Sequence, residues 1–354
     1  MLCLFSCFSV GQTKDEHNAG TGSVAVPTPT NAPNARGGVV PLSPVNTSPN
    51  GYLKEQQLAR QLHASSSKLL QVPTFSSYGE AQCDGDGNMF FHVAAGGFSG
   101  SRVIKIFADG EHSTVYEPSD KFTKDTAFRS FSVTPSGTVR QLIETHEGVF
   151  VVDFTQEGEM SGSTRLDLPE EVEPQDFASF DNGVIVFYGS YGEKASKNLL
   201  GHMYVGVFAP SGKLISRVQD PKNPDVNELS RSIKSGAVTL GKDGNVYLLR
   251  SSEIVALSQS GEVLRRMPFE HESDYAATKI TYSDGLLAIS LTKVHKHEVF
   301  RRYVVLNAST GERRGYYEPS DETGNGDVCF SRKEGFTFTR VESGKVLLVS
   351  AQLR

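Results

Sequence analysis

Three carboxylates share a spacing that could bring them together. Each of Glu80, Asp176 and Asp327 lies seven or eight residues before a glycine that follows an apolar run. Carboxylate oxygens that converge on one point are the ligands that Ca²⁺ takes in proteins, and they also suit a cationic organic ligand. These residues therefore predict a site for Ca²⁺ or another divalent cation, if the fold places the three runs side by side. The alternative is that they are ordinary polar residues of a solvated opening.

Two long stretches between apolar runs could carry recognition. They cover residues 189–202 and 292–302. Long loops on a rigid scaffold commonly bind ligands, although neutral variation of loop length is the alternative. Two histidines at i and i+2 could also face a surface metal, or simply belong to a solvated loop. The candidate ligand-binding residues in these loops are Tyr191, His202, His295 and His297.

The common catalytic motifs do not occur in this sequence. It contains no Gly-x-Ser-x-Gly, no P-loop, no His-Glu-x-x-His and no Cys-x-x-Cys. The net charge is −6 and the pI about 5.9, so there is no general attraction to nucleic acid or to an anionic membrane. We expect no nucleic-acid partner and no transmembrane helix.

The elements that would position the carboxylates form a repeat. A polar residue followed by glycine closes an apolar run six times, at Asp86-Gly87, Ser136-Gly137, Asn182-Gly183, Asp243-Gly244, Asp284-Gly285 and Glu334-Gly335. The glycines are 50, 46, 61, 41 and 50 residues apart. A second turn glycine follows in the first five units, at Gly110, Gly158, Gly212, Gly261 and Gly311. Four short strands per unit at this period are typical of a β-propeller.

We therefore expect an all-β fold, a six-bladed β-propeller of four-stranded antiparallel blades over residues 79–354. The first strand of each blade would line the central channel. Counting back seven residues from each first-turn glycine then places one residue per blade at the same channel entrance. That count gives Glu80, Ser130, Asp176, Ala237, Thr278 and Val328, with Asp327 one residue earlier.

The sixth unit supplies only three strands before the chain ends at Arg354. An incomplete blade leaves an unpaired edge, which invites aggregation. The missing outer strand is most simply supplied by the N-terminal side, around Ser67–Phe75. We expect this strand to close the ring.

The units resemble NHL-type and related six-bladed propellers. The resemblance rests on Asp86-Gly87-Asn88, Asp243-Gly244-Asn245 and Ser211-Gly212-Lys213, and it covers roughly residues 79–354. An aspartate that such repeats often place after the second strand is absent, because Arg250-Ser251-Ser252 stands there. The resemblance implies a fold that serves binding scaffolds, lactonases and lyases alike. Propeller lactonases place a metal at the channel entrance, which adds to the case for the three carboxylates.

The N-terminal part reads as three segments. Residues 1–11 are apolar and similar to the core of a secretory signal or a lipoprotein signal, which predicts export. Residues 12–50 are rich in Pro, Gly, Ser and Thr and predict a disordered linker. Residues 51–78 predict a short helix, over 52–65, and the closing strand. We expect an exported monomer.

Cys83 and Cys329 fall on the innermost strands of the first and sixth units, which become neighbours if the ring closes. An exported protein could form a disulfide there. Inner strands of adjacent blades usually diverge too far for the required Cα separation, which favours two buried free cysteines.

The sequence is compatible with two functions. The first is an exported, non-enzymatic propeller that binds a protein, peptide or glycan on its loop face. The second is a metal-assisted hydrolase or lyase, similar to the lactonases, that acts at the channel entrance through the three carboxylates.

Overall fold

The computed structural model describes residues 59–70, 78–84, 86–94, 101–122, 126–218, 238–250, 252–296, 298–324, 328–331, 335–343 and 345–353. The apolar start and the predicted linker lie outside these ranges. Within them, none of the helical segments has the length and hydrophobicity that crossing a membrane would require.

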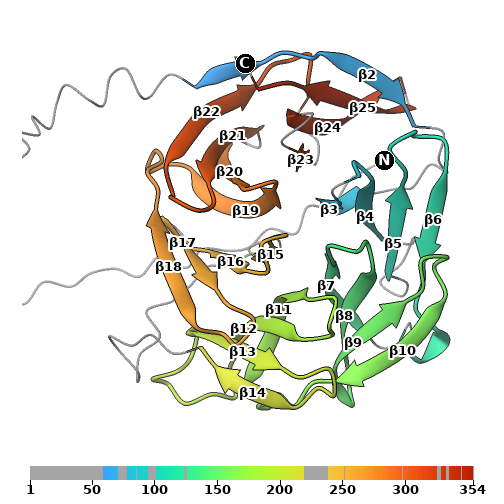
Figure 1. Ribbon diagram of the computed structural model, residues 1–354, viewed down its shortest axis with the longest axis vertical. Coiled ribbons are helices and arrows are strands. Elements are labelled where there is room, and N and C mark those ends of the chain that lie inside the picture. Colours follow the sequence, from blue (N-terminus) through green and yellow to red (C-terminus); the bar gives the residue numbers. More distant parts are fainter. Residues whose placement is uncertain are drawn as a thin grey trace, which may run out of the picture. The chain divides into compact units, whose positions relative to one another are not determined.

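The described strands form six sheets arranged in a ring around a common axis, and all their pairings are antiparallel except that of one added outer strand (Figure 1). This confirms the predicted six-bladed propeller. Blade 1 consists of β3 (Tyr78–Cys83), β4 (Met89–Ala94), β5 (Ser101–Ile106) and β6 (Ser113–Tyr116). After the short 3-10 helix η1 (Asp120–Phe122), blade 2 consists of β7 (Ala127–Val133), β8 (Val139–Thr145), β9 (Gly148–Phe154) and β10 (Met160–Arg165).

The third and fourth blades repeat this order from the channel outwards. Blade 3 consists of β11 (Val172–Ser179), β12 (Ile185–Tyr191), β13 (Met203–Phe208) and β14 (Leu214–Arg217). Blade 4 consists of β15 (Val238–Leu240), β16 (Val246–Leu249), β17 (Glu253–Leu257) and β18 (Val263–Pro268).

The last two blades recruit strands from the N-terminal side. Blade 5 consists of β19 (Ala276–Ser283), β20 (Leu286–His295), β21 (Glu298–Asn307), β22 (Arg313–Pro319) and β1 (Arg60–Leu62). Blade 6 consists of β23 (Val328–Ser331), β24 (Gly335–Glu342), β25 (Lys345–Ala351) and β2 (Ser66–Leu69).

Strand β2 closes the ring as the sequence predicts. It runs antiparallel to β25, with Ser66 opposite Ser350 and Leu69 opposite Leu347. The preceding strand β1 is an addition that the sequence does not predict, since it pairs in parallel with the outer edge of β22. A helix was expected over 52–65; of these residues, 59–65 are described, and they contain β1 in extended conformation.

The second turn glycine of each unit has a role beyond its own turn. Gly158 in blade 2 has φ of 95°, and a Cβ there would lie 2.2 Å from the carbonyl oxygen of Val115 in blade 1. Gly212 in blade 3 has φ of 80° and would place a Cβ 1.9 Å from the carbonyl oxygen of Arg165 in blade 2. Glycine is required at both positions, because the conformation is left-handed and the neighbouring blade approaches closely. The recurring glycine therefore marks a contact between blades as well as a hairpin.

The hydrophobic core lies between the blades. One cluster of buried side chains extends from Val186 and Tyr188 in blade 3 through Tyr247 in blade 4 to Ile289 and Val304 in blade 5. Each sheet is therefore covered on both faces, which explains why its strands are apolar almost throughout. The ring positions its inner strands rigidly, and the polar residues on those strands define the channel.

Candidate functional site

The channel wall contains a repeated β-bulge. The register shifts between Phe128 and Ser130 in β7, between Pro174 and Asp176 in β11, and between Ala277 and Lys279 in β19. A bulge re-aims the side chain beside it, and bulges occur often near functional sites. Ser130, Asp176 and Lys279 consequently occupy equivalent positions on three inner strands.

The expectation that Thr278 holds this position in blade 5 is wrong by one residue. Ser283 pairs directly with Leu286, so the turn of blade 5 contains two residues. In blade 3 the corresponding turn is longer, because Phe180 hydrogen-bonds to Val184. Because the turn of blade 5 is one residue shorter, the position equivalent to Asp176 lies one residue nearer to the turn glycine. Lys279, a cation, occupies this position.

Asp176 is the described member of the predicted carboxylate site. Its side chain is buried, and its oxygens accept hydrogen bonds from the backbone N–H of Phe177 at 2.8 Å and of Val238, on blade 4, at 3.3 Å. Tyr188 lies opposite Asp176 on the neighbouring strand. Burial raises the pKa of the Tyr188 phenol, and the negative charge of Asp176 adds to this effect. Asp176 therefore ties β11 to β15 with its carboxylate.

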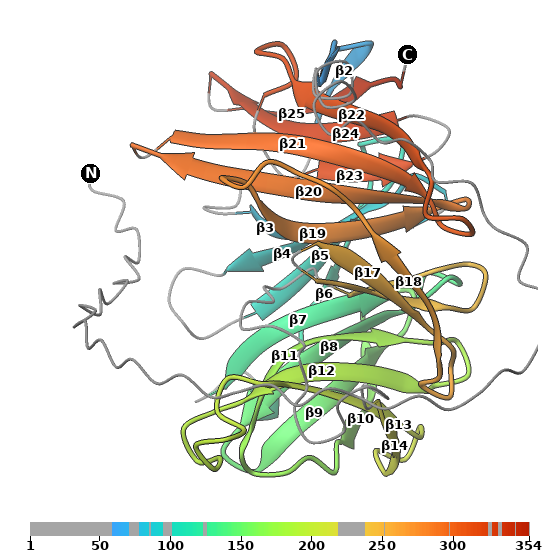
Figure 2. The same ribbon diagram turned by 90° about the vertical axis from the view of Figure 1, so that its left-hand side faces the viewer.

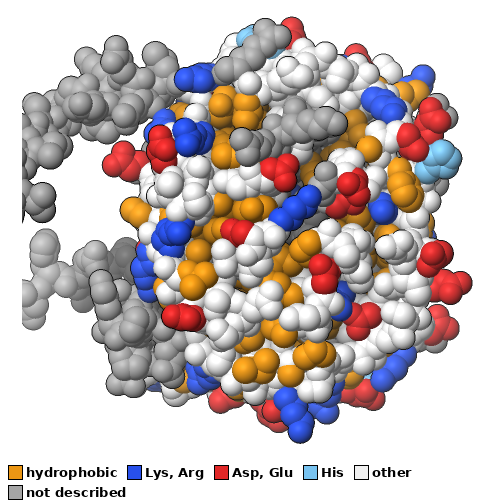
Figure 3. Space-filling model, in the orientation of Figure 1, with side chains coloured by type: hydrophobic (Ala, Val, Ile, Leu, Met, Phe, Trp, Pro, Cys, Tyr) orange, Lys and Arg blue, Asp and Glu red, His pale blue; other side chains and the backbone are white. Residues whose placement is uncertain are grey.

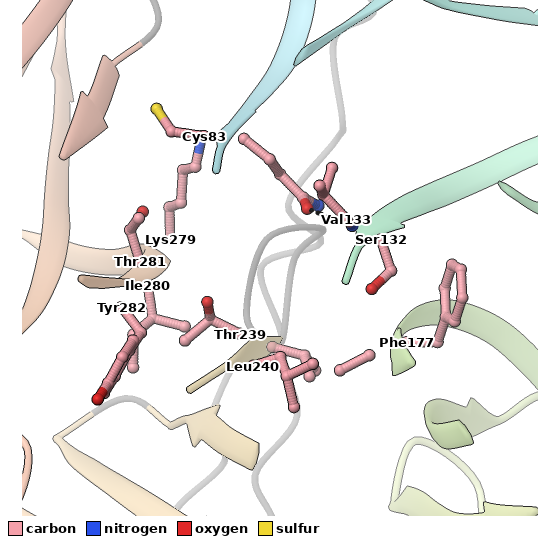
Figure 4. A pocket seen from close by; sticks show the side chains of 13 residues that line it. Cys83, Ser132, Val133, Phe177, Thr239, Leu240, Lys279, Ile280, Thr281 and Tyr282 are labelled. Carbon is pink, nitrogen blue, oxygen red and sulfur yellow. Dashed lines mark hydrogen bonds between the residues drawn. The ribbon is translucent and has the colours of Figure 1, made fainter. Parts of the chain in front are cut away.

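Other polar side chains tie the inner strands in the same way. Lys279 donates a hydrogen bond to the carbonyl oxygen of Ala81 in blade 1. Gln82 of blade 1 bridges to β7, donating to the carbonyl oxygen of Phe131 at 2.5 Å and accepting from the N–H of Val133 at 3.2 Å. Figure 4 shows Lys279 extending across the channel toward β3. The wall is thus held by its own polar groups.

One cavity in the described part of the channel, lined by residues such as Gln82, Phe177 and Lys279, has a volume of about 60 Å³. Small-molecule sites usually measure roughly 300–1,000 Å³. This cavity is therefore too small for a sugar-sized substrate.

The three-carboxylate site stays a prediction. Glu80 lies in β3, but its side chain is outside the described part, and Asp327 is not described at all. Among the described residues, no group of three or more His, Cys, Asp or Glu side chains could hold a metal ion. At the level of Asp176, the described part of the channel wall contains one carboxylate (Asp176), one hydroxyl (Ser130) and the ammonium group of Lys279. This set does not suit a divalent cation.

Cys83 and Cys329 form a disulfide, so the expectation of two free cysteines is wrong. Their Cα atoms are 5.8 Å apart, within the usual range. The bond joins β3 of blade 1 to β23 of blade 6, the two strands that meet where the ring closes. Although the inner strands of adjacent blades usually diverge, β3 and β23 lie close enough at this seam to form the bond.

The stretch 292–302 is a hairpin and not a loop. Strands β20 and β21 each run for ten residues and pair without interruption up to His295 opposite Glu298. The hairpin projects beyond the neighbouring strands on one face of the ring (Figure 2). His295 lies at its tip and is exposed, and His297 lies outside the described residues.

The tip of this hairpin exposes apolar side chains on both of its faces. Val294 is 70% exposed and lies opposite Val299, which is 40% exposed. Phe300, 41% exposed, is on the other face, opposite Lys293. Lys296 at the turn has φ of 48°, a left-handed conformation that costs a non-glycine residue about 1–2 kcal/mol. We call these residues, 293–300 without His297, the hairpin tip.

A cluster of charged and aromatic side chains supports the base of the hairpin. Tyr275 faces two cations, with the guanidinium carbon of Arg302 4.9 Å and the Lys293 ammonium 5.9 Å from its ring centre. Arg302 and Tyr316 both hydrogen-bond to the carboxylate of Glu272. Burial raises the pKa of Tyr316, and its bond to Glu272 adds to the rise. These contacts hold the base of the hairpin against the segment that precedes β19.

The other two candidate residues lie at the end of β12. Tyr191 is its last residue; it is 6% exposed and accepts a hydrogen bond from Arg217 at 2.5 Å. His202 is half-buried, and its carbonyl oxygen accepts a hydrogen bond from the N–H of Tyr191. Leu200 in the same loop is 49% exposed. The structure thus separates Tyr191 and His202, on blade 3, from the blade 5 hairpin.

The face seen in Figure 3 carries acidic and basic side chains interspersed with apolar ones.

Comparison with known proteins identifies no family. No family model matches the chain, and no curated protein matches it. A gluconolactonase from Xanthomonas campestris is 13% identical, over 82% of this chain and 99% of that chain, with a TM-score of 0.48. The calcium-binding protein regucalcin from Agrobacterium tumefaciens is 14% identical, over 84% and 98%, with a TM-score of 0.46. A protein of unknown function from Bacteroides caccae is 14% identical, over 72% and 86%, with a TM-score of 0.47.

Proposed function

We propose that this protein is a non-enzymatic binding propeller that docks a protein or peptide partner on the hairpin tip of blade 5. The observation that carries the proposal is the exposure of Val294, Val299 and Phe300 on both faces of a projecting hairpin. Apolar side chains grouped at an exposed tip often mark a surface that contacts another protein.

The backbone conformation of Lys296 also supports a binding role for the hairpin tip. A two-residue hairpin turn normally takes Asn-Gly or a similar pair, because its residues have positive φ. Here a lysine stands in the left-handed conformation with its side chain exposed. Unfavourable backbone conformations persist where a function needs the residue, which supports a binding role for this side chain.

The charge of the hairpin indicates the chemistry of the partner. Strands β20 and β21 with their turn contain four basic residues and one acidic residue. Lys293 is paired with Asp274 and Arg302 with Glu272, so the exposed cation at the turn is Lys296. The partner segment that fits best combines acidic side chains with apolar ones. A neutral glycan offers a complement to neither feature.

A displayed peptide library tests the proposal. Selection on the full-length protein should enrich peptides that contain both acidic and large apolar residues. A variant with Val294→Asp and Phe300→Asp should lose this enrichment. The matched control is Leu264→Asp on β18, since Leu264 is 49% exposed and lies on another blade, blade 4. Equal enrichment by the double variant and the wild type would contradict the proposal.

The disulfide supports the export that the apolar start of the sequence predicts. Disulfides persist in oxidising compartments and are rare in the cytosol. Export remains part of the proposal. Finding the protein in the reducing cytosol with Cys83 and Cys329 as free thiols would argue against it.

The alternative function, metal-assisted hydrolysis or lysis at the channel entrance, has its own test. Calorimetric titration of the wild type with Ca²⁺ should show binding that Asp176→Asn abolishes if the three carboxylates form a site. Lys279 at the same level of the wall opposes a divalent cation, so we expect no such binding.

A further inference from the structure

A second cavity lies at the seam of the ring, where blade 6 meets blade 1. Its volume is about 350 Å³, within the range of small-molecule sites. Residues of β2 and β25 line one side, and the turns of blade 1 that contain Gly87 and Ala108 line the other. The Cys83–Cys329 disulfide forms part of its wall.

Cys83 also lines the narrow cavity of the central channel. The disulfide therefore separates two cavities, and it is reached from the seam side through the larger one. Cys83 is partly buried, whereas Cys329 is 3% exposed and packs among apolar side chains such as Leu70 and Met89. An incoming thiol therefore meets the sulfur of Cys83 more readily than the sulfur of Cys329.

We propose that Cys83 is a site of reversible thiol modification, at which a low-molecular-weight thiol entering the seam cavity forms a mixed disulfide. The thiolate of the small molecule attacks Cys83 Sγ and forms a new S–S bond. The Cys83–Cys329 bond breaks, and its electron pair leaves on Cys329 Sγ, which takes up a proton in the cavity. One small thiol and one protein disulfide give one mixed disulfide and one protein thiol, so no other oxidant or reductant is needed.

The lining of the cavity favours a small anionic thiol. Hydroxyl groups of Ser66, Ser331 and Ser350 supply hydrogen-bonding groups, and Lys68 supplies a positive charge. A nearby cation favours the thiolate form of the incoming molecule, which is the reactive form. Because the bond is reached only through a lined cavity, we expect exchange over minutes to hours.

The ring stays closed when the bond is exchanged, because two other contacts cross or complete the seam. Strand β2 remains paired with β25, and Lys68 donates a hydrogen bond to the carbonyl oxygen of Ala108 in blade 1 at 3.4 Å. The modified protein should therefore keep its fold. The modification changes the inner wall of the seam alone.

The test exposes the full-length native protein to reduced glutathione, followed by acid quenching, alkylation and peptide mass spectrometry. The expected product carries glutathione on Cys83 and the alkylating group on Cys329, with an unchanged circular dichroism spectrum. A protein dithiol such as thioredoxin, too large for the cavity, should react far more slowly. An adduct on Cys329, or reaction in denaturant only, would overturn the proposal.

A cavity-filling variant tests whether glutathione reaches Cys83 through the seam cavity or from another part of the surface. Ser350→Tyr should slow glutathione addition by about tenfold or more, which corresponds to an added barrier of about 1.4 kcal/mol. Ser163→Tyr, at an exposed position of β10, is the matched control and should react as the wild type does. Equal rates in all three proteins, each confirmed as folded, would show that the seam cavity is not the route.

Discussion

Asp176 in blade 3 and Lys279 in blade 5 occupy the same position of their inner strands, each directly after a β-bulge. Both side chains tie their strand to another blade, Asp176 through the N–H of Val238 and Lys279 through the carbonyl oxygen of Ala81. The channel wall thus uses opposite charges at one level to hold the ring together. Polar residues there have a structural role whether or not a ligand binds.

Replacing Asp176 by asparagine should destabilise the fold by about 1–3 kcal/mol. Its two oxygens accept backbone N–H bonds from Phe177 and Val238, and an amide has only one acceptor oxygen. Urea unfolding curves measure the change. Asp321→Asn, at an exposed position, is the control and should differ from the wild type by less than about 0.5 kcal/mol. A neutral effect of Asp176→Asn would mean that the tie contributes little.

Stability should fall as the pH falls from about 6.5 to about 4, because of His92. Burial lowers the pKa of His92 from 6.5 to about 4. In this window the unfolded chain binds a proton at His92 that the folded protein does not bind, so protonation favours unfolding. The contribution is fully present above pH 6.5 and, after allowance for partial exposure, amounts to about 1–2 kcal/mol.

A phenylalanine at position 92 tests this assignment. The His92 ring stacks on Phe128 with centroids 3.9 Å apart, and a phenyl ring can keep that stacking without a titrating group. His92→Phe should therefore flatten the dependence of the unfolding free energy on pH between 4 and 6.5. If the slope is the same in both proteins, another group is responsible for it.

Removing the disulfide should lower stability while leaving the fold intact. Cys83 and Cys329 are 246 residues apart, so the bond restricts a long loop in the unfolded chain. The double variant Cys83→Ser, Cys329→Ser should lose about 2–5 kcal/mol relative to the oxidised wild type. Guanidinium unfolding with and without reductant measures this loss, and reductant should have no effect on the variant. Equal stability of the two oxidised proteins would count against the bond as a clamp.

Truncation tests the closing strand. A variant without residues 1–58 keeps β1 and β2 and should unfold much as the full chain does. A variant without residues 1–70 loses β2 and exposes the edge of β25, so it should lose more than about 3 kcal/mol and self-associate. Thermal unfolding and size-exclusion chromatography distinguish the two. The same melting temperature for both would exclude β2 as the closure of the ring.

The repeat was predictable because its signals are local. Each turn glycine and the apolar runs around it specify a hairpin without reference to the rest of the chain, and β2 follows from the need to complete blade 6. Strand β1 was not predictable, since three residues that pair in parallel with β22 leave no pattern. Thr278 was expected where Lys279 stands, because the shorter turn at Asp284-Gly285 changes the count from the glycine.

The disulfide and the hairpin were missed for different reasons. Pairing of Cys83 with Cys329 depends on how closely the first and last blades approach, which is a property of the closed ring. The hairpin had a signal in the sequence, because apolar residues continue through Val294, Val299 and Phe300 at strand spacing.

The most direct test of the proposed function measures the affinity of the full-length protein for a fluorescent peptide of alternating glutamate and leucine. We predict saturable binding that weakens at least tenfold, about 1.4 kcal/mol, in the Val294→Asp, Phe300→Asp variant and is unchanged in Leu264→Asp. Both variants should unfold within about 0.5 kcal/mol of the wild type, because the substituted side chains are exposed. Absence of binding to the wild type, or equal binding by the hairpin variant, would contradict the account.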